Sequence, residues 1–287
     1  MRSIDEIEEM RAAVRTALAK EQKVGLVPTM GALHEGHLSL VRRAKDLSDV
    51  VVMSIFVNPA QFGRGEDFDR YPRDLPRDAG LAAEAGVDIL FTPGVKEIYP
   101  EGFSTYVTVE GVSDRYEGAV RPGHFRGVAT VVLKLLDIVR PDVAVFGQKD
   151  AQQVAVVNRL VADLDLAVEV VVAPTVREKD GLAMSSRNAY LDPKDREAAL
   201  VLSAALRRAE GRVVEGELDA RRIAAVLGEE IAREPRATLD YADVVSPVSF
   251  APVEVVEAGS VAIAAARFGS TRLLDNVVLH PAGTEGR

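Results

Sequence analysis

The chain has 287 residues, of which 47% are hydrophobic and 28% are charged, the balance of an ordinary folded globular protein. Two domains, or one domain with a large appendage, fit this length better than one compact unit. The absence of cysteine excludes disulfides, thiolate zinc sites and cysteine nucleophiles. The net charge of −9 disfavours a surface built to bind nucleic acid, although a local basic pocket for a nucleotide remains compatible with it.

The beginning of the chain is acidic and polar and lacks the apolar segment of a secretory signal. No later apolar stretch is long enough to cross a bilayer. We therefore expect a cytoplasmic protein that does not associate with membranes.

The first part of the chain alternates helical patterns with short, β-branched apolar runs. Ser3 is expected to cap a helix that runs to about Ala19. A further helical pattern covers 128–139, and the expected strands are 24–27, 50–57, 87–91, 143–146 and 168–172. Such continuously apolar strands between amphipathic helices predict an α/β fold with a doubly wound parallel sheet. Ligands bind beyond the carboxyl ends of the strands in such sheets.

After about Val176 the pattern changes to helices followed by strands. The expected helices are 193–209 and 218–233, and the expected strands are 239–245, 261–268 and 271–279. We predict a first domain at 1–176 and a smaller α+β domain at 177–287, joined by the polar stretch 177–188.

The first predicted strand leads into a loop with two glycines and two histidines, Met30-Gly-Ala-Leu-His34-Glu-Gly-His37, before a helical segment. Glycines let backbone approach a ligand closely, and a helix N-terminus attracts phosphate. His34 and His37 lie three residues apart and therefore share a face, where they could stabilise charge on a phosphoryl group. Two solvated histidines, or half of a zinc site, are alternatives that this segment alone leaves open.

Three further polar segments follow predicted strands or join the domains. Asn58 and Gln61 could bind a hydroxy acid, or could reflect turn chemistry at Asn58-Pro59. The segment 147–150 places Gly147 and Lys149 before a helical pattern with Gln152 and Gln153, which suits phosphate, although a surface Lys–Asp pair is an alternative. The segment 179–188 could close over a triphosphate or be a polar linker.

Taken together, these segments resemble the pantoate-beta-alanine ligase family over nearly the whole chain. The motifs that carry the resemblance are VPTMGALHEGH at 27–37, SIFVNPAQF at 54–62, RPGHFRGV at 121–128, VFGQKD at 145–150 and GLAMSSRN at 181–188. The resemblance implies a Rossmann-like domain that binds ATP and pantoate, and a C-terminal lid domain. It also implies two reactions: pantoate attacks the α-phosphate of ATP and releases pyrophosphate, then β-alanine attacks the pantoyl-adenylate and releases AMP.

The resemblance also implies roles for individual residues. His34, His37, Lys149 and Arg187 would be catalytic, with His37 in the place of a proton donor. Gln61, Gln153 and Asn58 would bind substrate, with Gln61 also bordering the β-alanine site. The residues expected to bind ATP are Met30, Gly31, Ala32, Leu33, His34, Glu35, Gly36, His37, Gly147, Gln148, Lys149, Asp150, Val176, Met184, Ser185, Ser186 and Arg187.

Mg²⁺ should accompany ATP, and Asp78 matches an acidic position of the family. Arg77 stands where some relatives have a second acid, which weakens a two-carboxylate metal site, and Gln148 replaces a glutamate found in many relatives. The resemblance further implies a homodimer. The alternatives are another adenylyl-transferring enzyme of the same nucleotidyltransferase superfamily and an ATP-binding regulatory module without catalysis.

Overall fold

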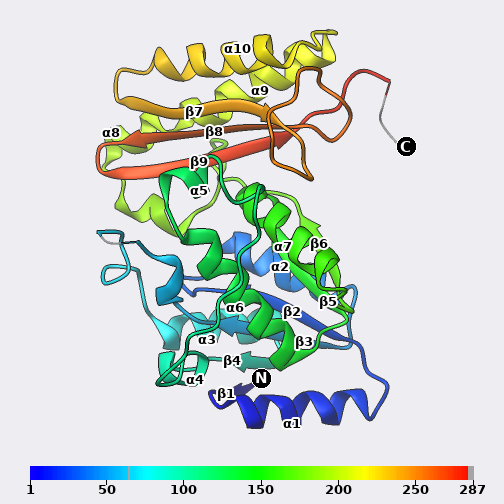
Figure 1. Cartoon of the computed structure of the whole chain (residues 1–287). Helices are drawn as coiled ribbons and strands as arrows, with labels where there is room; N and C mark the ends of the chain where they lie inside the picture. Colours follow the sequence, from blue (N-terminus) through cyan, green and yellow to red (C-terminus); the bar gives the residue numbers. More distant parts are fainter. Residues whose placement is uncertain (64, 284–287) are drawn as a thin grey trace. The chain divides into compact units, whose positions relative to one another are not determined.

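The computed structural model describes residues 1–63 and 65–283, and these form two compact units (Figure 1). The N-terminal unit comprises Met1–Gly147 and Gln152–Pro174. The C-terminal unit comprises the short segment Gln148–Ala151 and the chain from Thr175 onward. The segment that carries Lys149 therefore packs with the C-terminal unit, although it directly follows a strand of the N-terminal one. Among the described residues, no helix is both long and apolar enough to cross a membrane.

The N-terminal unit is built on a parallel sheet, whose described part has six strands in the order β1-β4-β3-β2-β5-β6. The predicted α/β class with a doubly wound sheet is thereby confirmed. Its strands are β1 (Arg2–Ile4), β2 (Val24–Thr29), β3 (Val50–Ile55), β4 (Ile89–Phe91), β5 (Val143–Gly147) and β6 (Glu169–Ala173).

The expected helix start at Ser3 is wrong. Ser3 lies in the edge strand β1, where it pairs with Leu90, and the first helix, α1 (Ile7–Leu18), begins four residues later. The backbone N–H of Arg2 donates to Asp88 over 2.8 Å, and that of Thr92 donates to Ile4 over the same distance. A strand of three residues has no readable periodicity, so only its pairing partner reveals it.

Helices cover both faces of this sheet (Figure 1). On one face, α2 (Glu35–Lys45) and α3 (Leu75–Ala85) bury apolar side chains against alternate strand residues such as Val27, Met53 and Val145. The remaining strand residues point the other way because side chains alternate along a strand. That face is covered by α1 and α6 (His124–Val139), which contact each other and β2. The other helices are α4 (Val95–Ile98), α5 (Glu117–Val120), α7 (Ala151–Asp163) and the 3₁₀ turns η1 (Pro59–Gln61) and η2 (Gln148–Asp150).

The strand order reverses direction between β2 and β5. The chain proceeds from β2 to β3 and β4 on one side and from β5 to β6 on the other. Loops that leave the carboxyl ends of such neighbouring strands diverge and open a crevice for ligands. Two predicted ATP-binding segments, 30–37 and 147–150, follow these two strands.

The C-terminal unit packs helices against a three-stranded antiparallel sheet. Its strands are β7 (Ala237–Val245), β8 (Val261–Phe268) and β9 (Thr271–Val278), in that order. Its helices are η3 (Ser186–Tyr190), α8 (Pro193–Ala198), α9 (Leu200–Val214) and α10 (Ala220–Ala232). Leu202, Leu206, Ile223, Leu227 and Phe268 belong to its core. The predicted helix 193–209 is interrupted at Ala199, whose backbone still has helical dihedral angles.

Candidate functional site

The loop after β2 holds an uncommon backbone conformation. Gly31 has φ +82°, and Ala32 has φ +49°, a left-handed conformation that is strained for a residue with a side chain. The carboxylate of Asp78 holds the loop in this shape, because its Oδ2 accepts from the N–H of Ala32 over 2.7 Å and its Oδ1 from that of Leu33 over 2.9 Å. Asp78 is 1% exposed and lies in the first turn of α3. The buried carboxylate of Asp78 therefore fixes the backbone at the start of the predicted phosphate loop.

These contacts do not fit the predicted use of Asp78 as a ligand of Mg²⁺. Besides the two backbone donors, Oδ1 accepts from Arg77 over 3.2 Å, and a metal ion beside that guanidinium would be repelled. Among the described residues, no three or more His, Asp or Glu side chains gather in an arrangement that could hold a metal ion.

His34 and His37 come together at the N-terminus of α2, as their spacing predicts. Their ring centroids are 4.1 Å apart, and His34 is the N-cap residue of the helix. The backbone N–H of His34 donates to Nδ1 of His37 over 3.3 Å. Because that ring nitrogen accepts, a neutral His37 carries its proton on Nε2 and can donate from there. At the N-terminus of a helix, whose dipole favours anions, this is an arrangement suited to phosphate.

A second group of polar residues lies after β3, where η1 packs closely on α6. Asn58 and Gln61 are both buried, and Asn58 Nδ2 donates to Gln61 Oε1 over 3.0 Å. The close approach requires Gly127 of α6, because a Cβ atom there would lie 2.3 Å from the backbone oxygen of Ala60 and 2.6 Å from the Cα of Gln61. Gln61 Nε2 lies 3.3 Å from the sulfur of Met30, so this group adjoins the phosphate loop.

The backbone carbonyl of Gln61 is held by a chain of charged and polar side chains. Glu66 accepts two hydrogen bonds from Arg121, which in turn lies 3.1 Å from Nε2 of His124. A guanidinium can only donate, so His124 accepts at Nε2 and donates from Nδ1 to the carbonyl of Gln61 over 2.9 Å.

Burial and neighbouring charges shift the pKa values of His124 and Glu66. Desolvation and the positive charge of Arg121 lower the pKa of His124 to about 4, so the imidazole is neutral at physiological pH. Burial alone would raise the pKa of Glu66, but the hydrogen bonds and charge of Arg121 outweigh that effect and lower it. Both groups therefore keep the protonation states that hold the Gln61 carbonyl.

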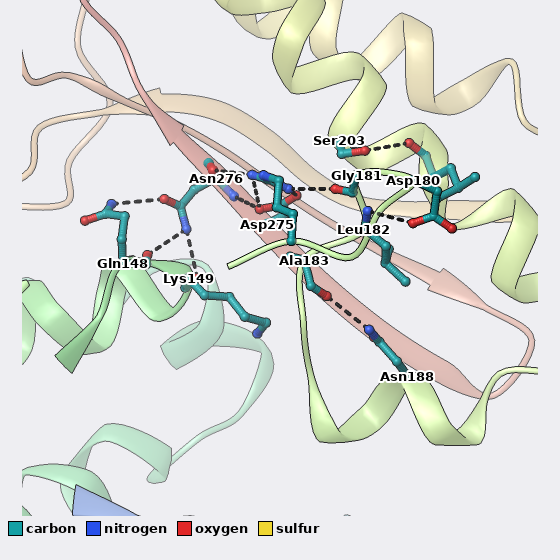
Figure 2. A network of polar contacts seen from close by, with 12 residues as sticks. Gln148, Lys149, Asp180, Gly181, Leu182, Ala183, Asn188, Ser203, Asp275 and Asn276 are labelled. Atoms are coloured by element: carbon teal, nitrogen blue, oxygen red, sulfur yellow. Dashed lines mark hydrogen bonds and ion pairs between the residues drawn. The ribbon is translucent and has the colours of Figure 1, made fainter. Parts of the chain in front are cut away.

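In the C-terminal unit, the segment 148–150 is tied to β9 by Asn276 (Figure 2). Asn276 Nδ2 donates to the backbone carbonyls of Gln148 over 3.0 Å and Lys149 over 2.8 Å. In return, Gln148 Nε2 donates to Asn276 Oδ1 over 3.0 Å. Lys149 Nζ lies 3.4 Å from a carboxylate oxygen of Asp150 and forms an ion pair with it. The backbone of the turn is thus fixed, while the lysine side chain ends at a weak, partly exposed contact.

The neighbouring residue of β9 anchors the loop that leads to the Met-Ser-Ser-Arg segment. Asp275 is 3% exposed and forms a bidentate pair with Arg177, at 2.6 and 3.0 Å. Arg177 also donates to the carbonyl of Gly181 over 3.2 Å, and Gly181 has φ +100° at the tip of the loop. Figure 2 labels Asp275 beside Asn276 and shows Gly181 in the neighbouring loop. Two adjacent residues of one strand therefore organise both predicted ATP-binding segments of this unit.

This loop is a short hairpin that ends in the turn η3. The backbone N–H of Met184 donates to the carbonyl of Val176 over 2.9 Å, which brings these two predicted residues together. Ser185 caps η3, and its hydroxyl accepts from the N–H of Arg187 over 3.3 Å. The hydroxyl of Ser185 consequently shapes the backbone on which Ser186 and Arg187 are presented.

The structure groups the predicted residues within each unit. Met30 to His37 adjoin Asn58 and Gln61 in the N-terminal unit. In the C-terminal unit, Asn276 of β9 binds Gln148 and Lys149, and Val176 and Met184 pair with each other in the hairpin that Arg177 and Asp275 anchor. Gln153 lies in the first turn of α7 and is half-buried. Its neighbour Gln152 is the buried one, and it binds backbone groups of the segment 112–117.

Sequence reasoning assigned no role to several residues that shape these groups. Arg121, His124 and Gly127 stood inside the motif RPGHFRGV, which was a signal without a stated function. Asp275 and Asn276 are two adjacent polar residues between apolar pairs in β9, Leu273-Leu274 before them and Val277-Val278 after them, a pattern that suggests a buried polar contact. Tyr99, which donates to Asn58, carried no signal in the sequence.

Comparison with known proteins gives a consistent picture along the whole chain. Residues 2–278 match the family model described as pantoate-beta-alanine ligase. The pantothenate synthetase of Heliobacterium modesticaldum is 55% identical and that of Acetivibrio thermocellus 52% identical, each over 97% of this chain and 99% of the relative. The crystal structure of pantothenate synthetase from Thermus thermophilus has a TM-score of 0.93 at 50% identity and covers 98% of this chain and 100% of that one. A pantoate-beta-alanine ligase from Francisella tularensis, complexed with an ATP ligand and β-alanine, has a TM-score of 0.79 at 36% identity and covers 97% of both chains.

Proposed function

The chain belongs to the pantoate-beta-alanine ligase family, and from that premise we propose that it joins pantoate to β-alanine through a pantoyl-adenylate. In the first step a carboxylate oxygen of pantoate attacks the α-phosphorus of ATP, and the bond to pyrophosphate breaks. In the second step the neutral amine of β-alanine attacks the acyl carbon, and AMP leaves with the oxygen that pantoate contributed. The amine loses a proton, and the product is an amide. No covalent bond to the protein forms in either step.

The observation that carries this proposal is the loop 30–37. Asp78 holds Ala32 in a strained conformation, and the chain then enters α2 through His34 and His37. Strain of this kind persists where the surrounding structure enforces it, and it is concentrated at functional sites. The helix N-terminus and the Nε2–H of His37 offer donors to a phosphate that gains negative charge during pyrophosphate loss.

The catalytic roles follow from what each side chain can supply. His34, His37, Lys149 and Arg187 bear the negative charge of the phosphates. Lys149 is suited to this because its ammonium can exchange a weak, partly exposed ion pair with Asp150 for a phosphate. His37 donates from Nε2 and acts mainly by hydrogen bonding, because catalysis of this reaction depends on placement and charge stabilisation.

Each unit contributes one set of ATP-binding residues in this proposal. The proposed ATP-binding residues are 30–37 and Gly147 of the N-terminal unit, and 148–150, Val176 and 184–187 of the C-terminal unit. The ATP ligand in the Francisella tularensis relative supports nucleotide binding, and its β-alanine supports the second substrate. Gln61 and Gln153 bind pantoate, and the buried Asn58 adjoins them through its hydrogen bond to Gln61.

Mg²⁺ enters this scheme as part of the nucleotide substrate. The carboxylate of Asp78 accepts hydrogen bonds from two backbone N–H groups and from Arg77, so in this proposal it stabilises the phosphate loop. The ligands of Mg²⁺ would then be phosphate oxygens and water. Mg²⁺ commonly keeps several water ligands and binds through substrate phosphates. The homodimer and the location in the cytoplasm stay predictions.

Isotope exchange of labelled pyrophosphate into ATP tests the first step directly. Exchange should require pantoate and should proceed without β-alanine, because the adenylate forms before the amine reacts. Complete turnover with β-alanine should then yield AMP and pantothenate in equal amounts. Exchange driven by an amino acid in place of pantoate would assign the chain to another adenylyl-transferring enzyme. ATP binding without any exchange would make it a regulatory module.

A further inference from the structure

The amide of Asn58 has an orientation that the main chain dictates. Its Oδ1 accepts from the backbone N–H of Ala60 over 3.2 Å, and its Nδ2 donates to the backbone carbonyl of Gly127 over 3.1 Å. A flipped amide would face a donor with a donor and an acceptor with an acceptor. Asn58 is 1% exposed, so water cannot relieve either conflict. The positions of its oxygen and nitrogen are therefore determined.

This orientation determines the amide of Gln61 in turn. The second N–H of Asn58 Nδ2 points to Gln61 at 3.0 Å, and only an oxygen can accept there. Gln61 must therefore turn its Oε1 to Asn58 and its Nε2 the other way. In the described part of the chain, the partner of that Nε2 is the sulfur of Met30 at 3.3 Å, which is a weak acceptor. Gln61 thus retains hydrogen-bond donor capacity beside the phosphate loop.

Tyr99 completes the chain of hydrogen bonds at its far end. Its hydroxyl donates to Asn58 Oδ1 over 2.8 Å and so fills the second acceptor position of that oxygen. Burial, reinforced by the nearby Tyr106 hydroxyl, raises the pKa of Tyr99 to about 12, so the group stays a donor at any physiological pH. The ring is packed edge-on against Phe103, with centroids 4.9 Å apart. Every hydrogen bond from Tyr99 to Gln61 points in the same direction, and each one polarises the next.

We propose that Tyr99 and Asn58 are positioning residues that set the hydrogen-bond polarity of Gln61, so that Gln61 recognises an acceptor oxygen of the substrate acid. The inference rests on the proposed function, in which Gln61 binds pantoate. A carboxylate offers only acceptors, whereas an ammonium group offers only donors. Gln61 therefore donates to an oxygen of pantoate and offers no hydrogen-bond acceptor to the ammonium form of β-alanine.

We call the hydrogen-bonded series Tyr99, Asn58 and Gln61 the relay. Two nearly isosteric variants test it through the Michaelis constants of the three substrates. Asn58→Asp replaces the donor atom by an oxygen, which repels Gln61 Oε1 and turns that amide around. We expect the KM for pantoate to rise tenfold or more, on the order expected for an unpaired buried group, while the KM values for β-alanine and ATP stay near those of the wild type. Tyr99→Phe should raise the KM for pantoate about threefold, since the backbone still orients Asn58. Tyr106→Phe, which removes an exposed hydroxyl, is the matched control.

A third variant, Gln61→Glu, tests the relay by the pH dependence of its KM for pantoate. A purely structural role of Gln61 would not change that dependence. In Gln61→Glu, one carboxyl oxygen accepts from Asn58 and the other faces the substrate as a second anion. Protonation would restore a donor at that position, so the KM of this variant for pantoate should fall as the pH decreases from 8 to 6, relative to the wild type. This measurement also stands if Asn58→Asp does not fold, which thermal unfolding would reveal.

The outcomes separate the relay from the proposed function. If the wild type shows no pantoate-dependent exchange, the proposed function fails first. If the wild type is active, the relay is contradicted by variants that raise the KM values for pantoate and β-alanine equally. A Gln61→Glu profile parallel to that of the wild type would contradict it as well.

Discussion

Asn276 donates from its side-chain Nδ2 to the backbone carbonyl of Lys149 over 2.8 Å, although the two residues lie 127 positions apart. The same nitrogen serves the carbonyl of Gln148, and the side-chain oxygen accepts from Gln148 in return. A single asparagine, 3% exposed, thereby fixes the backbone that carries the proposed phosphate-binding lysine.

Replacing Asn276 should impair adenylation without unfolding the protein. In Asn276→Asp a carboxylate oxygen would face two carbonyl oxygens, so the turn must move and Lys149 with it. We expect pyrophosphate exchange to slow by about tenfold, which corresponds to ~1.4 kcal/mol, within the range for a disrupted buried hydrogen bond.

Lys149→Ala sets the scale for that measurement, with an expected loss on the order of a hundredfold or more if the ammonium stabilises phosphate charge. The exposed Asn158→Asp is the matched control and should exchange like the wild type. Wild-type exchange in Asn276→Asp would show that the turn does not depend on β9.

Asp78→Asn should reveal whether this carboxylate serves the loop or a metal ion. An asparagine can accept from only one of the two N–H groups of Ala32 and Leu33, and its own amide would repel the other. Loss of the clamp should destabilise the fold by about 1–3 kcal/mol and weaken ATP binding.

Titration with Mg²⁺ distinguishes the two roles of Asp78. A loop clamp predicts that the defect of Asp78→Asn persists at saturating Mg²⁺, whereas a lost metal ligand would be compensated by a higher concentration of the ion. Asp74→Asn, which changes the exposed N-cap of α3, is the control and should cost about 1 kcal/mol or less.

His124 should make the stability depend on pH in the acidic range. Its pKa is about 4 in the folded protein against 6.5 for a solvent-exposed imidazole, so between these values the unfolded chain binds more protons. The free energy of unfolding should therefore fall as the pH decreases from 6.5 to 4, by about 3 kcal/mol at most from this group.

Urea unfolding at several pH values measures this contribution. In His124→Asn, whose amide can still donate to Gln61, the decline between pH 6.5 and 4 should be flatter than in the wild type. His280→Gln, at an exposed position, should leave the decline unchanged. Identical slopes in His124→Asn and the wild type would mean that His124 is not held neutral by its surroundings.

Two helical glycines should respond oppositely to alanine. In Gly127→Ala the new Cβ would meet the backbone of Ala60 and Gln61 at 2.3–2.6 Å, so α6 and η1 must separate. We expect a loss of about 1–3 kcal/mol from overpacking and a higher KM for pantoate, because Asn58 also bonds to the carbonyl of Gly127.

Gly211 in α9 provides the comparison, because a Cβ atom there meets no heavy atom within 4 Å. Gly211→Ala should be neutral or stabilising by up to about 1 kcal/mol, since alanine restricts the unfolded chain and favours helix. Thermal and urea unfolding of both variants measure the difference. A tolerated Gly127→Ala would contradict the close packing of η1 on α6.

The sequence by itself determined the class of the fold and the segments that carry the chemistry. Continuously apolar strands alternating with amphipathic helices require a parallel sheet covered on both faces, and this sheet is present. The pairing of His34 with His37 was also predictable, because helical spacing is a local property. The division of the chain at 176/177 and the roles of the individual residues stay predictions.

The tertiary structure alone decided which side chains hold these segments in place. Asp78 and Ala32 are 46 positions apart, and Asn276 and Gln148 are 128 apart, so neither pair leaves a periodic trace in the sequence. The same holds for the edge strand β1 and for the hydrogen bond from Tyr99 to Asn58. Buried polar groups must find partners wherever the fold brings them. That requirement is satisfied only after the chain has folded, which is why the contacts of Asp78 with Ala32 and Leu33 could not be predicted from the sequence.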